Sequence, residues 1–583
     1  MSIGHFSRGG KLDRLIQRGL WAHAQLAAFA IASAVAVWPR AADAQILPQV
    51  PNAGRVIEEL RQPLPAPTPQ KPDIRIEPPA DEKTKGKDTP PFRVASFRVT
   101  GATVYSEKQL LDVLGPAGAD LTLFQVQERA AQLTKFYNDH GYAVARALVP
   151  AQDVRDGIVE VRVVEGRYGN IDIRNATEVS EARIRELLGD AKEGAIVFGP
   201  ALEKGVLLVS DLAGITPKAT LEPGDKPGLT DLVVEIGAAK AQDYSLTLDN
   251  AGNRFTGKNR LAASFTWNGP ADIGDRLSAS FTTSGQLLQS LRVGYELPVG
   301  NPAFRVGPYV SHTYYRLGEN FSALDANGTA DSYGATFSYP LIRSAALNVR
   351  AIGALEARRL EDRVGSTGSV NNKALDLMQV GLGGDARDGF LAGALTAFQG
   401  QITGGNLKLE TPTFAAIDAI GPQAAGTYSK FLANVTRIQG LSEDWRLGIT
   451  YTGQWATNNL DSSEKFSVGG LTGVRAYPPG EAAGDDAQLI QLELRHQGTQ
   501  IGPGQLSPFG FYDAARSRIN HNPFASFATR NVRGIAGYGV GAEYAVPGML
   551  FVRGWLAFKA TSDPSTADTD RSSRFWLQTG IVF

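Results

Sequence analysis

The last 344 residues of the chain consist of short segments in which apolar and polar residues alternate. Tyr244, Leu246 and Leu248, for example, are separated by single polar residues. The same pattern recurs over 276–281, 291–297, 333–339 and 445–451. A period of two residues is typical of β-strands whose two faces meet different surroundings. We count sixteen such segments, so a strand with its connection takes about 21 residues.

Alternation is also found in soluble β-sandwiches, and two further features favour a membrane barrel. First, about 21 residues for each strand and its connection leave room for membrane strands of about 9–11 residues. Second, short and long connections alternate, as they do in outer-membrane barrels. The short connections are 341–344, 440–444 and 547–548, and the long ones are roughly 318–331, 410–429, 458–486 and 516–531.

The end of the chain agrees with a barrel. Phe583 is the last residue, and Phe575, Leu577, Thr579 and Ile581 share one face of a terminal strand. Closure of the sheet would remove the open edge that hydrocarbon cannot satisfy. The sequence therefore predicts a membrane β-barrel of 16 antiparallel strands over residues 239–583.

The N-terminus has the features of an export signal. Lys11, Arg14 and Arg18 precede the nearly uncharged apolar stretch 26–38, which is short for a membrane-spanning helix. Ala42 and Ala44 then fit an A-x-A cleavage site before Gln45. We predict a signal peptide over 1–44. The chain has no cysteine, which suits an exported protein and excludes disulfides and thiolate metal sites.

The region between signal and barrel divides into four parts. Residues 45–62 are predicted to contain a short helix, and 63–91 hold nine prolines and read as a semi-rigid linker. Residues 92–166 follow the order strand, helix, helix, strand, strand, with Ser106 as an N-cap, and 167–238 repeat that order. Two small α+β domains are therefore predicted before the barrel.

One long connection carries a distinctive motif. The predicted loop at about 458–486, between the eleventh and twelfth strands, contains Val468-Gly-Gly-Leu-Thr-Gly-Val-Arg-Ala-Tyr-Pro478. A nearby strand contains Phe509-Gly-Phe-Tyr-Asp513. Phe511 and Asp513 are two residues apart, so their side chains would lie on the same face of the strand, which we predict to face the lumen. A guanidinium at Arg475 and a carboxylate at Asp513 could form a charge-assisted, bidentate pair.

These features together resemble the outer-membrane transporters of two-partner secretion (TpsB type, the haemolysin-activator and filamentous-haemagglutinin exporter family). The paired α+β domains resemble POTRA domains, and 136–142 and 164–168 look like segments that mark the secretion branch. Gly473, Val474, Arg475 and Tyr477 match the tip of the sixth extracellular loop, which in that family folds into the lumen. Phe511 and Asp513 match its barrel-wall partner. Ala476 stands where the family usually has Gly, which would shape the tip differently if φ were positive there.

The resemblance implies a function and a set of partners. The POTRA domains would bind an unfolded exoprotein of TpsA type, such as a haemagglutinin, haemolysin or adhesin, in the periplasm. The barrel would then secrete it across the outer membrane without ATP, and the N-terminal helix would plug the resting pore. Biogenesis would involve outer-membrane lipid, periplasmic chaperones and the barrel-assembly machinery, which reads the strand ending in Phe583.

Other functions remain open at this point. A barrel-insertion factor of the same superfamily and a passive porin are alternatives. An enzyme is not expected, because no G-x-S-x-G or H-E-x-x-H occurs and His312, His496 and His521 fall on separate predicted strands or loops. Basic and acidic residues nearly balance, at 58 and 59, so nucleic acid is not an expected partner. No metal or cofactor is predicted.

Overall fold

The computed structural model describes residues 51–60, 72–77, 89–525, 527 and 530–583. The predicted signal peptide and its cleavage residues Ala42, Ala44 and Gln45 lie outside the described residues, as does most of the predicted linker. Among the described helices, none has the length and apolar character needed to cross a membrane.

The first α+β domain packs two helices against short strands around one apolar core. Helix α3 (Glu107–Leu114) begins after the N-cap Ser106, and α4 (Leu123–Asp139) begins with a capping box between Thr122 and Gln125. The predicted strand from Phe92 is interrupted at Ala95, whose N–H bonds to the carbonyl of Gly157. The strands are β2 (Phe92–Val94), β3 (Ser96–Thr100), β4 (Ala119–Leu121), β5 (Arg146–Leu148) and β6 (Ile158–Val164), with sheet order β3-β6-β5 and a β2-β4 pair.

The second domain repeats this topology with longer strands. Its elements are β7 (Arg167–Asn175), α5 (Glu181–Leu188), α6 (Gly199–Ser210), β8 (Ile215–Pro223) and β9 (Leu229–Ala238). As in the first domain, the first and last strands pair in parallel and the last two pair antiparallel. A separate core of Val, Leu and Ile side chains lies between the sheet and the two helices.

A fourth strand joins this second sheet from the predicted linker. Strand β1 (Asp73–Ile76) pairs in parallel with β8, from Asp73 opposite Lys218 to Ile76 opposite Leu221. Ile74 packs against the domain core. The proline-rich region was predicted to be a spacer only, so the pairing of these four residues is a difference from that expectation. The edge of β8 is therefore already occupied by a segment of the same chain.

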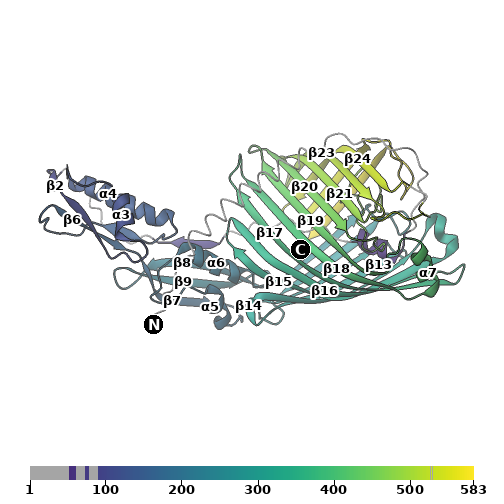
Figure 1. Cartoon of the computed structure of the whole chain (residues 1–583), viewed down its shortest axis with the longest axis horizontal. Helices are drawn as coiled ribbons and strands as arrows, with labels where there is room; N and C mark the ends of the chain where they lie inside the picture. The colour runs from purple at the N-terminus through teal and green to yellow at the C-terminus, as the bar shows by residue number, and fades with distance from the viewer. Residues whose placement is uncertain (1–50, 61–71, 78–88, 526, 528–529) are drawn as a thin grey trace. The chain divides into compact units, whose positions relative to one another are not determined.

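The remaining residues form a closed antiparallel barrel, in which β26 pairs back onto β10 (Figure 1). The three-residue β22 continues the path of β21 along β23, so the wall has sixteen strands, as predicted. The strands are β10 (Gln242–Asp249), β11 (Arg260–Asn268), β12 (Arg276–Thr283), β13 (Leu288–Val299), β14 (Asn301–Arg316), β15 (Ala326–Arg343), β16 (Leu347–Val364), β17 (Ser369–Asp388), β18 (Ala394–Leu409), β19 (Gly426–Gly440), β20 (Trp445–Ala456), β21 (Asp486–His496), β22 (Thr499–Ile501), β23 (Gly504–Arg518), β24 (Val532–Val546), β25 (Leu550–Lys559) and β26 (Ser573–Val582).

Several strands are longer than a bilayer requires. Strand β17 has 20 residues, and β15 and β16 have 18 each, whereas about 9–11 residues cross the hydrocarbon. The connection predicted over 318–331 is shorter than expected because β15 already begins at Ala326. It holds the 3₁₀ helix η1 (Glu319–Leu324), and α7 (Pro412–Ile420) lies in the connection between β18 and β19.

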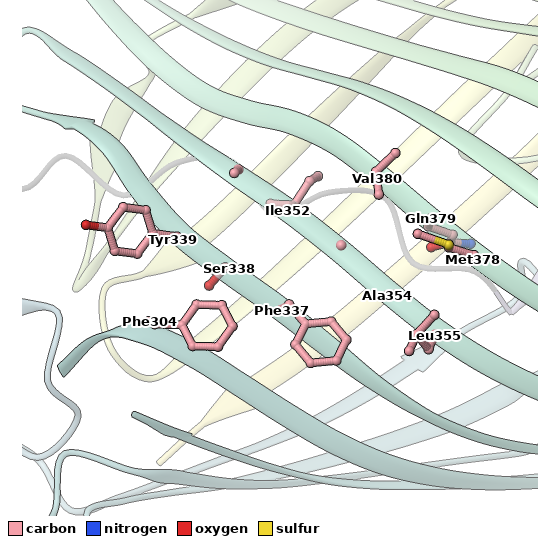
Figure 2. A pocket seen from close by; sticks show the side chains of 12 residues that line it. Phe304, Phe337, Ser338, Tyr339, Ile352, Ala354, Leu355, Met378, Gln379 and Val380 are labelled. Atoms are coloured by element: carbon pink, nitrogen blue, oxygen red, sulfur yellow. The ribbon is translucent and has the colours of Figure 1, made fainter. Parts of the chain in front are cut away.

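The outer wall is apolar, as the alternation predicted. Tyr244, Leu248, Leu291 and Tyr333 are among its exposed large side chains. Residues of β14–β17, among them Gly353, line a shallow depression in this wall, and Figure 2 shows the side chains around it. The depression is lined mainly by apolar side chains, including Phe304, Phe337, Leu355, Met378 and Val380. Such a surface suits contact with lipid.

Candidate functional site in the barrel lumen

The longest connection of the barrel, residues 457–485 between β20 and β21, is called loop 6 below. Loop 6 folds into the barrel and places its tip against β21, β23 and β26. Arg475 lies at this tip with 5% of its surface exposed, and Asp513 on β23 is fully buried. Arg475 Nε donates to Asp513 Oδ2 at 2.9 Å and Nη2 donates to Oδ1 at 2.7 Å. The backbone N–H of Arg475 also donates to Oδ2, at 3.0 Å.

Three further groups complete the surroundings of Arg475. Its Nη1 donates to Glu493 Oε2 on β21 at 2.8 Å. The guanidinium carbon lies 3.7 Å from the ring centroid of Phe511, so the cation stacks on the aromatic face. The indole N–H of Trp576 donates to the carbonyl of Arg475 at 2.7 Å. The sequence reasoning did not identify Glu493 and Trp576.

Burial and ion pairing act on Arg475 in opposite directions. Loss of water alone would lower the pKa of the guanidinium, but the hydrogen bonds and the charge of Asp513 outweigh burial and raise the pKa. Arg475 is therefore a permanent cation that is held by two carboxylates. This arrangement fixes a loop to a rigid wall; it offers no group poised to exchange a proton.

The other predicted tip residues have separate packing roles. Val474 is fully buried in the apolar cluster that also contains Phe511 and Trp576. Gly473 passes so close to Val468 that a Cβ would lie 2.3 Å from the carbonyl oxygen of Val468. Tyr477 is fully buried and bonds to Thr561 Oγ1 at 3.0 Å. Burial raises the pKa of Tyr477 to about 12, so it stays a neutral phenol.

Ala476 does not require the backbone conformation that glycine would allow. It is not among the residues with positive φ in the described part of the chain. Its methyl group is fully buried and faces Gly537 on β24, where a Cβ would lie 2.4 Å from that of Ala476. The wall thus has space for the extra methyl of the loop.

The first residues of loop 6 are fixed to other strands of the wall. Glu464 accepts from Arg358 Nη1 on β16 at 2.8 Å and pairs with Lys430 on β19 at 2.8 Å. Asp461 pairs with Lys373 on β17 at 3.0 Å. The tip is bound to β21, β23 and β26, so ion pairs and hydrogen bonds hold both the start and the tip of loop 6 to strands of the barrel.

A helix from the N-terminal part of the chain also lies inside the barrel (Figure 1). Helix α2 (Ala53–Glu59) begins at Asn52, whose side chain accepts from the N–H of Arg55. The N–H of Ala53 donates to Asp362 on β16 at 2.7 Å, and Asn253 donates to Glu59 Oε1 at 2.9 Å. The predicted helix at 45–62 thus has a described core of seven residues within the lumen.

Helix α2 contacts loop 6 as well as the wall. Ser462 Oγ donates to Asn52 Oδ1 at 2.9 Å. A Cβ on Gly54 would lie 2.6 Å from the backbone nitrogen of Ser463, so the helix and the loop approach with no space for a side chain. The predicted plug helix and loop 6 therefore touch each other in this structure.

Part of the lumen wall beneath α2 is apolar. Ala53 and Val56 pack in a cluster with inward-facing leucines, among them Leu288, Leu360 and Leu377. The inside of a water-filled barrel is normally polar. A patch of leucines is stable there only while another apolar surface covers it, and α2 supplies that surface.

The last predicted residue, Phe583, lies away from this site. Its backbone pairs with Tyr244 at the junction of β26 and β10, and its side chain is 63% exposed. The three barrel histidines lie on β14 (His312), at the end of β21 (His496) and after β23 (His521). His312 and His521 each pair with an aspartate. Among the described residues, no group of three or more His, Asp or Glu side chains could hold a metal ion.

The comparisons with known proteins agree with this architecture. The family model "Haemolysin secretion/activation protein ShlB/FhaC/HecB" matches residues 228–544, and the model "POTRA domain, ShlB-type" matches 92–166. Heme/hemopexin transporter protein HuxB from Haemophilus influenzae strain 86-028NP is 26% identical over 466 residues, which are 79% of this chain and 81% of HuxB. Outer membrane transporter CdiB from Dickeya dadantii is 24% identical over 72% of this chain and 75% of its own.

Solved structures show the same fold. CdiB from Escherichia coli superposes with a TM-score of 0.67 at 18% identity, covering 86% of this chain and 93% of CdiB. The family model spans more than half of this chain, and the POTRA model covers the first of the two α+β domains. The chain therefore belongs to the haemolysin secretion/activation family ShlB/FhaC/HecB, the outer-membrane transporters of two-partner secretion.

Proposed function

We propose that this transporter binds its partner exoprotein in an unfolded, extended form at the sheet edges of the two POTRA domains and passes it outward through the barrel. The family establishes that the chain secretes a partner exoprotein across the outer membrane with its POTRA domains in the periplasm. The mode of capture, the resting plug and the role of loop 6 are the proposal.

The observation that carries the proposal is the pairing of β1 with β8. Strand β1 is a short extended segment that adds to the edge of a POTRA sheet through backbone hydrogen bonds and one partly buried apolar side chain, Ile74. A client segment with one apolar residue in a polar stretch could use the same kind of contact. In the first domain, β5 lies at the edge of its sheet and exposes half of Leu148.

The lumen must change for a chain to pass. Helix α2 and loop 6 both lie within it, so we propose that the structure represents the resting state and that α2 leaves first. The sequence contains no P-loop motif. Folding of the exoprotein outside the cell would then make its movement irreversible, without ATP.

A photo-crosslinking experiment tests the proposed capture. A photoreactive amino acid replaces Leu148 on β5, and the exposed Lys108 on α3 is the matched control position in the same domain. The probe is the exoprotein encoded beside this chain, arrested in transit by a folded C-terminal fusion. We expect cross-links to the arrested exoprotein from position 148 and few from 108. Equal cross-linking from both positions would contradict capture at the edge of β5.

The same experiment separates the alternatives. A barrel-insertion factor would cross-link to barrel precursors in place of an exported chain. A passive channel would give no cross-link to either. The family consists of transporters, which argues against an enzyme, and we propose no catalytic role. Biogenesis is proposed to follow the route of other outer-membrane barrels, with periplasmic chaperones and recognition of the terminal strand by the barrel-assembly machinery.

The identity of the exoprotein is a finer question. HuxB is named as a heme/hemopexin transporter and CdiB as an outer membrane transporter. We propose a TpsA-type partner for this chain, and a secretion assay with the neighbouring exported protein would identify it.

A further inference from the structure

Another buried ion pair holds the tip of loop 6, six residues after Arg475. Glu481 is fully buried. Its Oε1 accepts from Arg533 Nη1 and, at 2.6 Å, from Thr566 Oγ1. Its Oε2 accepts from the backbone N–H groups of Thr566 at 2.8 Å and Ala567 at 3.0 Å. Four donors therefore surround this one carboxylate.

Arg533 connects the pair to the rest of the barrel. It lies on β24, and 1% of its side chain is exposed. Its Nη2 donates to the carbonyl of Pro564 at 2.8 Å, and its Nη1 also donates to Thr566 Oγ1 at 3.1 Å. Loop 6, strand β24 and the connection between β25 and β26 thus meet at Glu481.

We propose that Glu481 is a positioning residue whose pair with Arg533 forms a second latch, able to hold loop 6 in the lumen when the pair of Arg475 and Asp513 is broken. The two pairs use different strands of the wall. Asp513 lies on β23 opposite Gly537 on β24, and Arg533 lies on β24 four residues before Gly537. At about 3.3 Å per residue, the two anchor points are roughly 13 Å apart along the wall.

The polarity of the two latches is opposite. At the first latch the loop supplies the cation, Arg475, and the wall supplies the anion, Asp513. At the second latch the loop supplies the anion, Glu481, and the wall supplies the cation, Arg533. A shifted loop would place a carboxylate against a carboxylate, which is unfavourable in a desolvated site. The charge order therefore selects a single docked position for loop 6.

The consequence is that breaking one latch does not release the loop. Loss of Arg475 unseats the tip, but Glu481 still has its four donors. Loss of the carboxylate at 481 leaves Arg475 between Asp513 and Glu493. Release of the part of loop 6 between Val468 and Glu481 therefore requires both latches to open, while Asp461 and Glu464 keep the start of the loop on the wall.

The absence of native cysteine allows a direct test by cysteine labelling. Val468→Cys places a reporter in loop 6 at a fully buried position. The side chain of Val468 belongs to neither latch, and its backbone N–H donates to the carbonyl of Glu481 at 3.2 Å. Intact cells that carry this reporter are treated with a membrane-impermeant maleimide, and the labelling rate is measured for Arg475→Ala, for Glu481→Gln and for the double variant. No exoprotein is needed, so the result does not depend on the proposed mode of client capture.

We expect each single variant to label within about threefold of the reference and the double variant at least about tenfold faster, because two independent restraints must both be lost. The matched control combines Arg475→Ala with Asp388→Asn, which breaks the pair of Asp388 with Arg437 elsewhere in the barrel. This combination should label like Arg475→Ala alone. Arg475→Ala with Glu481→Asp, which keeps a carboxylate, should label more slowly than the double variant with Gln.

Two outcomes would overturn the second latch. In the first, Arg475→Ala alone labels as fast as the double variant. In the second, the double variant labels no faster than the reference. Heat-modifiable migration on a semi-native gel verifies that each barrel has folded, and if the double variant fails this check, Arg475→Lys with Glu481→Gln replaces it and is judged by the same two outcomes.

Discussion

Arg475 and Asp513 are 38 residues apart in sequence, yet they form three hydrogen bonds in the lumen of the barrel, two of them from the guanidinium fork. One residue belongs to a loop and the other to a strand of a closed sheet. The pair therefore helps to make a long connection part of the channel wall.

The first prediction concerns this pair. Arg475→Ala should strongly reduce secretion of the exoprotein while the barrel still inserts, because removal of one partner of a buried pair typically costs about 3–5 kcal/mol. Asp513→Ala should behave similarly, and the double variant should be no worse than either single variant. Arg475→Lys should rescue poorly, because lysine lacks the planar fork. The measurement is exoprotein in the medium, normalised to barrel in the outer membrane. Normal secretion from Arg475→Ala would refute a role for the pair in transport.

The second prediction concerns α2 as a plug. Deletion of residues 45–62 should raise single-channel conductance in planar bilayers, because α2 occupies the lumen. Gly54→Leu should also raise the conductance, because a side chain at this position collides with Ser463 and displaces α2. The control is Glu58→Gln, a nearly isosteric change in the same helix at a partly exposed position, which adds no bulk against loop 6. Unchanged conductance after the deletion would contradict the plug.

The third prediction concerns pH. Burial raises the pKa of Glu59 in docked α2, although the hydrogen bond from Asn253 and the charges of Arg55 and Arg260 oppose this shift and Glu58 adds to it. A group with a raised pKa in the docked state binds its proton more tightly there, so docking strengthens as the pH falls and weakens as it rises. Channel opening should therefore increase as the pH rises above the range in which a glutamate carboxyl ordinarily titrates. Glu59→Gln should lose this dependence, and an unchanged slope in that variant would assign the effect to another group.

The fourth prediction concerns location and processing. The mature protein should begin at Gln45 and fractionate with the outer membrane. It should migrate as a compact species on a semi-native gel until heated, because a closed sheet resists detergent. N-terminal sequencing and the gel shift are the measurements. A first residue well before Ala42 in the membrane-inserted protein would contradict cleavage at the A-x-A site.

The sequence predicted the barrel well because a two-residue period is a local property. Each strand carries its own alternation, so the number of strands and the lipid-facing residues, such as Leu291 and Tyr333, could be read one segment at a time. Strand length was less predictable. Strands such as β17 extend beyond the hydrocarbon, where the apolar row no longer marks a strand.

The contacts of loop 6 were only partly predictable. Parity placed Asp513 in the lumen, and the motif singled out Arg475; the structure brings them together, while their part in secretion stays a prediction. Glu493 was missed because its position beside Phe511 depends on the register between β21 and β23, which alternation does not define. The sequence did contain one indication: the alternation pattern places the side chain of Glu493 on the lumen face of the strand that precedes the one with Phe511. Glu481 and Arg533 were missed for a related reason. Their pairing depends on the path of the loop inside the barrel, which the alternation pattern does not define either.

The four residues of β1 have a mechanical consequence for α2. Helix α2 ends at Glu59 and β1 begins at Asp73, so the thirteen residues 60–72 join a helix in the lumen to a strand on a POTRA sheet. Even fully extended, a segment of this length spans roughly 45 Å. A helix that moves farther than this from the edge of β8 must pull β1 off that edge. The length of this short connection therefore couples the distance that α2 can move to the pairing of β1 with β8.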